Sequence, residues 1–379
     1  MENPLPHSND VLFRTLTVKN LTIPNRIAMA PMTRCFSPNR VPGANVADYY
    51  RRRAEGGTGL IITEGTYIPH AGAWNDDNIP DFHGEVALAG WKKVVDDVHA
   101  AGAKIFPQLW HIGLIVAPEL EGFYEGKKLE DRQVGPSGMV GGLGVKPSMQ
   151  GKAMSQADID AVIDAYAAAA LSAQQLGFDG VELHAAHGYL IDQFFWAGTN
   201  LRTDRYGGDL VARTRFACEI VEEIRNRCGP DFVIDLRYSQ WKQHDYTALL
   251  AETPQELERF LAPLVDAGVD MFHASQRRFW EGEFGTDLNL AGWTKKLTGK
   301  PAISVGSVSL DGDFLAAFAG ESSSGTGIDQ LVEMMDRADF DMIAVGRALI
   351  VDPDWPHKVR DGAGDGFVNY TPKALETLA

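Results

Sequence analysis

The sequence predicts an α/β fold, an eight-stranded (β/α)8 barrel that forms one domain over residues 1–379. The chain repeats one unit, a short apolar β-branched run, a polar loop and a helical pattern, and no linker or shift of composition divides it. The eight strand-like runs are residues 25–31, 59–65, 103–109, 178–184, 232–238, 270–276, 301–307 and 341–347. Strands that alternate with helices pair in parallel through right-handed crossovers, and eight such units close into a barrel. A doubly wound open sheet is the alternative, but it leaves two strands too many and lacks a nucleotide fingerprint after the first strand.

Two segments lie outside the repeating unit, and each is expected to cover one end of the barrel. Residues 12–23 precede the first strand and are expected to form a hairpin that plugs the barrel floor. The largest insertion, residues 112–153, follows the third strand and contains the glycine-rich run GPSGMVGGLG and the charged patch EGKKLEDR. A long loop on the carboxyl side of a barrel is a plausible lid over a site.

Capping signals mark two of the intervening helices. Residues 155–158, SQAD, form a capping box before an apolar periodic stretch, and Gly177 stands where that helix ends. Residues 253–256, TPQE, repeat the device, with Pro at the first helical position, Glu reaching back, and Gly268 closing the helix.

Composition and charge restrict the partners of the protein. The chain has 379 residues, and its formal net charge of −16 makes nucleic acid and anionic membranes improbable partners. The first residues lack a basic region followed by an apolar core, so no signal peptide is expected, and no apolar run has the length of a membrane span. The three cysteines have no metal-binding spacing and cannot all pair, which is typical of free thiols in a cytoplasmic protein.

In a barrel of this kind the chemistry lies where strands end and the following loops begin. Polar residues and glycines gather at these positions, namely Thr33, Glu64, Gly65, Gln108, Trp110, His111, His184, His187, Tyr189, Arg237, Gln276, Arg277, Arg278, Gly306, Gly346 and Arg347.

The last two strands carry an anion-binding pattern. Gly306 and Gly346 end strands seven and eight, and Arg347 follows directly. Glycine lets backbone amides approach an anion, and barrels often bind phosphate at this place. The pattern favours phosphate binding over glycines that only permit tight turns.

The sequence does not decide which group is the partner of the Arg237 guanidinium. The side chain alternates with Asp235 along strand five and is expected to point into the barrel mouth. A buried guanidinium needs an anionic or strongly polar partner. That partner is either a ligand or, in a core salt bridge, Asp235 or Glu182.

Two imidazoles and a phenol follow strand four. His184 and His187 can donate two hydrogen bonds to one oxygen and so stabilise negative charge that develops there, while Tyr189 can deliver a proton. A metal site built from Glu182 and the two histidines is a second interpretation, and satisfied core histidines are a third.

Seven motifs in colinear order resemble the Old Yellow Enzyme family of FMN-containing ene-reductases. They are PMTR (31–34), TEGT (63–66), QLWH (108–111), HAAHGYLIDQF (184–194), NLRTDRYGG (200–208), SVGSV (304–308) and AVGRALIVDPDW (344–355). The similarity extends from about residue 11 to 360. The threonine at position 33 resembles the threonine-bearing branch, since the other branch commonly has cysteine there.

The resemblance implies roles residue by residue. Pro31, Thr33 and Gly65 would contact the isoalloxazine ring of tightly bound FMN, and Gln108 and Arg237 would hold its pyrimidine edge. Its phosphate would be bound by Gly306, Gly346 and Arg347. His184 and His187 would bind the activating oxygen of the substrate, Tyr189 would protonate the substrate carbon, and Trp110 would shape the pocket wall.

The implied reaction is a ping-pong hydride transfer from NADPH or NADH, through the flavin, to the C=C bond of an α,β-unsaturated carbonyl or nitro compound. The implied assembly is a monomer or a homodimer. Another FMN barrel, such as a dienoyl-CoA reductase-like enzyme, is the nearest alternative, but those relatives carry a cysteine cluster for an iron–sulfur centre, and here the three cysteines are scattered. A metal-dependent hydrolase using Glu182, His184 and His187 is the alternative from a different class.

Overall fold

Eight parallel strands close into the predicted barrel in a computed structural model, which describes residues 9–115, 131–312, 320–362 and 366–379. The strands pair in the order β10-β11-β12-β13-β14-β3-β4-β5. In chain order they are β3 (Ile27–Met29), β4 (Leu60–Tyr67), β5 (Lys104–Trp110), β10 (Gly180–His187), β11 (Val233–Lys242), β12 (Met271–Ser275), β13 (Ala302–Val305) and β14 (Met342–Val345). Each begins inside one of the eight runs predicted from the sequence, and β4, β5, β10 and β11 continue two, one, three and four residues past the ends of their runs.

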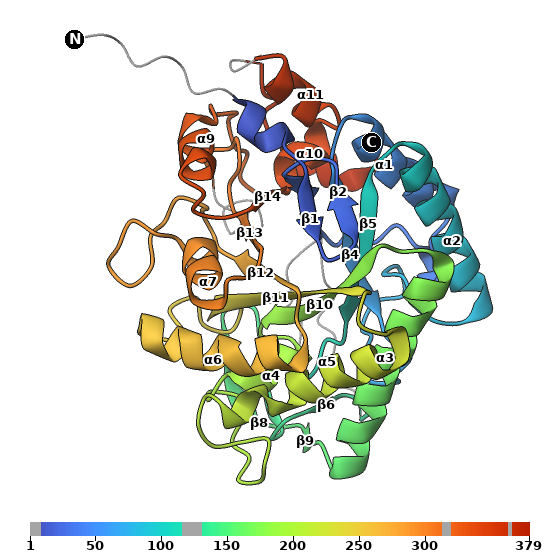
Figure 1. Cartoon of the computed structure of the whole chain (residues 1–379). Coiled ribbons are helices and arrows are strands. Elements are labelled where there is room, and N and C mark those ends of the chain that lie inside the picture. The colour runs from blue at the N-terminus through green and yellow to red at the C-terminus, as the bar shows by residue number, and fades with distance from the viewer. Residues whose placement is uncertain (1–8, 116–130, 313–319, 363–365) are drawn as a thin grey trace.

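Helices surround the barrel, as the ribbon view shows for α2, α3, α5, α6 and α7 (Figure 1). The α-helices are α1 (Ala44–Glu55), α2 (Glu85–Ala100), α3 (Gln156–Leu176), α4 (Leu190–Phe195), α5 (Arg215–Cys228), α6 (Pro254–Ala267), α7 (Leu290–Thr298), α9 (Asp329–Asp336), α10 (Arg347–Val351) and α11 (Trp355–Arg360). The 3₁₀ helices are η1 (Asn9–Phe13), η2 (Pro38–Arg40), η3 (Ala212–Thr214) and η4 (Pro372–Glu376). Within the described ranges, no helix is both long enough and apolar enough to cross a bilayer.

The predicted floor hairpin is present, although it is shorter than residues 12–23. It consists of β1 (Leu16–Val18) and β2 (Leu21–Ile23), paired antiparallel, and η1 precedes it. Alternate hairpin side chains are buried in one apolar cluster with residues of the barrel interior such as Phe106 and Met342. The hairpin therefore closes the amino-terminal end of the barrel.

The predicted capping box of α3 is confirmed, and the predicted cap of α6 is confirmed in part. Ser155 accepts a hydrogen bond from the backbone N–H of Asp158, and the Asp158 carboxylate accepts one from the N–H of Ser155. In α6 the side chain of Thr253 accepts from the N–H of Glu256, but the Glu256 carboxylate reaches back to Glu252 rather than to the cap residue.

The insertion after β5 carries short strands in its described part. These are β6 (Val134–Gly135), β7 (Met139–Gly142), β8 (Val145–Met149) and β9 (Lys152–Ala153), with β6 paired to β9 and β7 to β8. Most of the charged patch at 125–132 lies outside the described residues, and the movement of residues 112–153 as a lid stays a prediction.

Candidate active site

A cavity of about 410 Å³ opens at the carboxyl ends of the barrel strands. Its volume is within the range of about 300–1,000 Å³ that is typical of small-molecule sites. All twelve site residues predicted from the sequence line it: Pro31, Thr33, Gly65, Gln108, Trp110, His184, His187, Tyr189, Arg237, Gly306, Gly346 and Arg347. Of the other polar strand-end residues, Glu64, His111 and Arg278 do not line this cavity.

The two imidazoles stand side by side and are electrically neutral. The rings of His184 and His187 lie 5.3 Å apart at a right angle. Burial, reinforced by the charge of Arg237, lowers the pKa of His184 to about 3 and holds the pKa of His187 well below its usual value. A neutral imidazole keeps one N–H donor and one acceptor, which suits it to hold a ligand oxygen.

A buried ion pair holds the turn that presents His187. This residue has a positive φ of 66°, which is uncommon for a side chain other than glycine. Asp192 accepts a hydrogen bond from the backbone N–H of Gly188 and a 2.6 Å bond from the Nζ of Lys242, and both charged side chains are fully buried. Ser239 accepts from the backbone N–H of His187. These bonds offset the strain of the turn and fix its direction.

Tyr189 is a partly buried phenol between aromatic neighbours. Its ring makes edge contacts with Trp110 and His184, each at a centroid distance of 4.8 Å. Burial raises the pKa of Tyr189 to about 12. The hydroxyl is therefore protonated at neutral pH and can donate a proton or a hydrogen bond into the cavity.

Arg237 faces the cavity rather than a carboxylate partner. Its Nη2 donates to the Oγ of Ser275 at 3.3 Å, and its buried Nε has no partner in the described part of the chain. Within those residues no ion pair joins it to Asp235 or Glu182. The core salt bridge that the sequence left open is thus not formed, and the guanidinium is available to an anionic or polar ligand.

Backbone packing alone requires glycine at position 306, at the end of β13. Gly306 has a φ of 130°, and a Cβ there would lie 2.7 Å from the carbonyl oxygen of Arg277. Arg347 donates to the carbonyl oxygen of Gly312 and, at 3.1 Å, to the Oγ of Ser323. The close backbone approach explains Gly306 without a ligand, so phosphate binding here stays a prediction.

The metal site proposed from Glu182, His184 and His187 does not assemble. Glu182 instead binds the Nδ1 of His273 at 2.6 Å and the Nε2 of Gln108 at 2.6 Å. Among the described residues, the one group of three potential ligands with atoms within 4.8 Å of one another is Glu182, Asp235 and His273.

Several cavity residues were not predicted from the sequence. They include Met32, Leu143, Trp241, Gln243, Tyr246, Ser275 and Tyr370. Trp241 stacks on His187 at 4.4 Å with an interplanar angle of 18°. The signal that could have found it was the polar and aromatic run SQWKQHDY at 239–246, which begins within the last residues of β11, where the apolar pattern stops.

The chain matches the model of the NADH:flavin oxidoreductase / NADH oxidase family over residues 11–365, and it belongs to that family. It is 31% identical over 364 residues to a chanoclavine-I aldehyde reductase of Penicillium roqueforti, covering 94% of this chain and 89% of the relative. It is also 31% identical over 385 residues to 12-oxophytodienoate reductase 7 of Oryza sativa subsp. japonica, covering 95% and 91%. Morphinone reductase in complex with tetrahydroNAD superposes with a TM-score of 0.74 at 30% identity, covering 96% and 93%.

These similarities confirm the predicted class. The protein is an NAD(P)H-dependent flavin oxidoreductase with the barrel of the Old Yellow Enzyme family, and it reduces activated C=C bonds.

Proposed function

We propose that the cavity binds FMN and, over it, the nicotinamide and the alkene in turn, with the twelve lining residues in the roles that the family resemblance implies. The single observation that supports this most is the convergence of residues from all eight strand ends on one cavity. Bound FMN would supply the hydride chemistry, and the protein supplies position and electrostatics.

The donor set of the cavity fits a flavin. Arg237 presents a buried cationic donor that contacts no counter-ion among the described residues, which suits a ring system that gains negative charge on reduction. Position 65 requires glycine, because a Cβ there would lie 2.6 Å from the side chain of Trp110 and 3.3 Å from the Oε1 of Gln108. Pro31, Thr33 and Gly65 would contact the ring, Gln108 and Arg237 its pyrimidine edge, and Gly306, Gly346 and Arg347 its phosphate.

Ser275 sets the tautomer of the second imidazole. Arg237 can only donate, so the Ser275 oxygen accepts from it, and the hydroxyl hydrogen is then available for the Nε2 of His187 at 2.7 Å. That arrangement leaves the proton of neutral His187 on Nδ1. His184 and His187 would together hold the carbonyl or nitro oxygen of the substrate, and removing one such donor costs about 10²–10³ in rate.

Tyr189 would protonate the substrate carbon beside the activating group. Its high pKa keeps the proton in place until carbanion character develops, and Trp110 would form the adjacent wall. Because nicotinamide and alkene use the same cavity in turn, the kinetics would be ping-pong.

The finer predictions follow the same lines. The hydride donor is NADPH or NADH, residues 1–379 form one FMN-binding domain, and the protein acts as a monomer or homodimer in the cytoplasm. The three cysteines are free, which agrees with a reducing compartment.

The test is spectroscopic and then catalytic. Purified protein is expected to show flavin absorbance bands that bleach under anaerobic NADPH or NADH and return on addition of cyclohexenone, a maleimide or a nitroalkene. Absence of a bound flavin after reconstitution with FMN would refute the assignment. Bleaching without reoxidation by any activated alkene would refute the proposed roles of the two histidines and Tyr189.

A further inference from the structure

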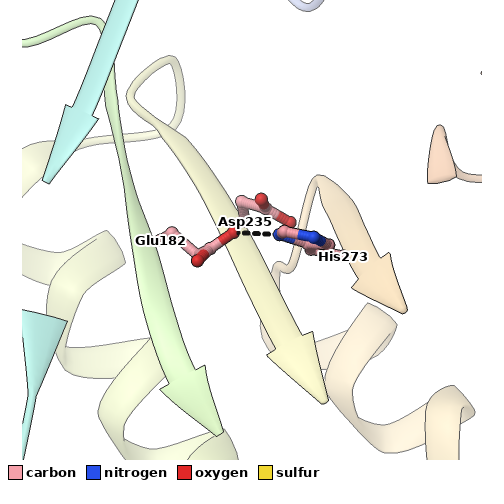
Figure 2. Close-up of side chains that lie close together, drawn as sticks. All are labelled: Glu182, Asp235 and His273. Carbon is pink, nitrogen blue, oxygen red and sulfur yellow. Dashed lines mark hydrogen bonds and ion pairs between the residues drawn. The ribbon is translucent and has the colours of Figure 1, made fainter. Parts of the chain in front are cut away.

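Three ionisable side chains that the proposed mechanism does not use lie buried inside the barrel. Glu182, Asp235 and His273 come from the adjacent strands β10, β11 and β12 and point toward one another (Figure 2). Each has less than 1% of its surface exposed. His184 and Arg237, which line the cavity, follow Glu182 and Asp235 by two residues on the same strands. Glu182, Asp235 and His273, here called the Glu182 cluster, therefore form the layer of side chains directly below the cavity.

The cluster holds one negative charge. Burial and the charge of Glu182 raise the pKa of Asp235 well above its usual value, whereas His273, Arg237 and a hydrogen bond from Asp235 outweigh burial and lower the pKa of Glu182 to about 2. Two carboxyl groups this close cannot both ionise in a low dielectric. Asp235 therefore carries a proton that it donates to the Glu182 carboxylate, and His273, its own pKa lowered by burial, is neutral.

The Glu182 carboxylate fixes the orientation of the Gln108 amide. A carboxylate only accepts hydrogen bonds, so the amide group that faces it at 2.6 Å must be the NH₂. The amide oxygen of Gln108 consequently points toward Gly65 and the cavity. If Glu182 were neutral, either end of the amide could occupy this contact.

Glu182 is also the buried anion that opposes the charge of Arg237. The pKa of Arg237 is lowered by burial, with Glu182 and then Asp235 acting in the opposite direction. The other ionisable groups near Arg237 add no net charge to this site. His184 and His187 are neutral and Tyr189 is protonated. Lys242 is paired with Asp192. A unit charge in such a site acts strongly over short distances.

We propose that the Glu182 cluster is a positioning network for the cofactor, in which Glu182 orients the Gln108 amide and offsets the charge of Arg237, and so sets the reduction potential of bound FMN. The inference rests on the proposed binding of FMN in the cavity. Asp235 stores the proton that keeps a single charge in the cluster, and His273 donates its Nδ1–H to Glu182. The cluster is not a metal site in this account, because both Glu182 oxygens already accept hydrogen bonds and Arg237 disfavours a second cation.

The test is a potentiometric titration of FMN-loaded protein. Glu182→Gln removes the charge that opposes Arg237, so the reduced flavin should be stabilised about tenfold relative to the oxidised form, a shift of about 30 mV to more positive potential for a two-electron couple. Asp235→Asn keeps a neutral donor to Glu182 and should leave the potential at the wild-type value.

Asp179→Asn is the control for loss of a hydrogen-bonded, partly buried carboxylate. Asp179 precedes β10 at the opposite end of the barrel, where it binds His99, Lys104 and the N–H of Ile105. This change should lower stability without moving the potential. An unchanged potential in Glu182→Gln, or an equal shift in Asp235→Asn, would overturn the proposal, whereas wild-type protein that binds no FMN would refute the proposed function itself.

A second measurement does not depend on the folding of Glu182→Gln. The infrared difference spectrum of wild type minus Asp235→Asn should contain the C=O stretch of a buried protonated carboxylic acid, because the raised pKa values of Glu64 and Asp192 affect both proteins equally. A difference spectrum without that band would contradict the single-charge cluster and place the proton elsewhere.

Discussion

The two ends of the barrel differ in how their buried groups are satisfied. At the floor, the hairpin side chains Leu16, Val18, Leu21 and Ile23 pack with apolar residues of the strands in one cluster. At the mouth, buried polar atoms have no partner among the described residues, including the Nε of Arg237, the Nδ1 of His184 and the Nε1 of Trp110.

An unsatisfied buried polar group costs about 1–3 kcal/mol, so the mouth is less stable than it could be, whereas the four apolar hairpin side chains carry no such cost. The difference shows that the two ends have different roles. Residues at the floor close the apolar core and stabilise the fold, whereas residues at the mouth leave hydrogen-bond donors unpaired, so that they can bind ligands. Changes at the mouth should therefore act on rates and on FMN, and changes at the floor on unfolding.

The largest effect is expected at the mouth. Tyr189→Phe removes the proton donor but keeps the ring between Trp110 and His184, so alkene reduction should slow by about 10²–10⁴. Reduction of the flavin by the nicotinamide should stay nearly unchanged. Stopped-flow measurement of the two half-reactions checks this, and equal slowing of both would contradict the proton-donor role.

A change at the turn that carries His187 should act on both rates and stability. Lys242→Met leaves the Asp192 carboxylate buried without its partner, which typically costs about 3–5 kcal/mol. Asp192 also holds the turn before Tyr189, so substrate reduction should weaken beyond the loss of folded protein. Urea unfolding measures the first effect and steady-state kinetics of the folded fraction the second.

The matched control for that change is Lys92→Met, which breaks the exposed pair with Asp96. Exposed pairs contribute about 0–1 kcal/mol, so this variant should be nearly as stable as the wild type. If both variants lost the same free energy of unfolding, burial of the Lys242–Asp192 pair would not explain the effect of Lys242→Met.

The barrel could be predicted because its signal is local. Each strand is a short apolar run, and the capping residues Ser155 and Thr253 lie within three residues of the groups they bind. The site residues followed from their place at strand ends and from motifs in colinear order. The fold then brings them together because all eight carboxyl ends meet at one side.

Contacts between distant residues could not be predicted in this way. Lys242 and Asp192 are separated by 50 positions, and neither has a local pattern that identifies its partner. The same is true of His273 and Glu182, separated by 91 positions. A carboxylate within the apolar run LIDQFF indicates only that a partner must exist somewhere in the fold.

At the floor, a truncation should affect stability alone. Ile23 is fully buried, so Ile23→Ala should lower the free energy of unfolding by about 2–5 kcal/mol. Thr22→Ala, on the exposed side of the same strand, is the control and should change it by less than about 0.5 kcal/mol. Both variants should keep the wild-type kcat and flavin potential, and a floor truncation that altered either would show that the two ends are coupled.

The smallest effect depends on pH. Glu64 accepts hydrogen bonds from the backbone N–H groups of Arg34 and Cys35, next to Thr33, and burial raises its pKa to about 7. A group whose pKa is raised in the folded state binds more protons there than in the unfolded state, so its contribution to stability falls as pH rises from about 4.5 to 7 and is constant above. Glu64→Gln should remove that fall, which amounts to roughly 3 kcal/mol at most. Urea unfolding of both proteins at pH 5 and pH 8 measures the difference, and an identical pH dependence would mean that Glu64 is ionised throughout, with its two backbone donors sufficient to hold the charge at the mouth.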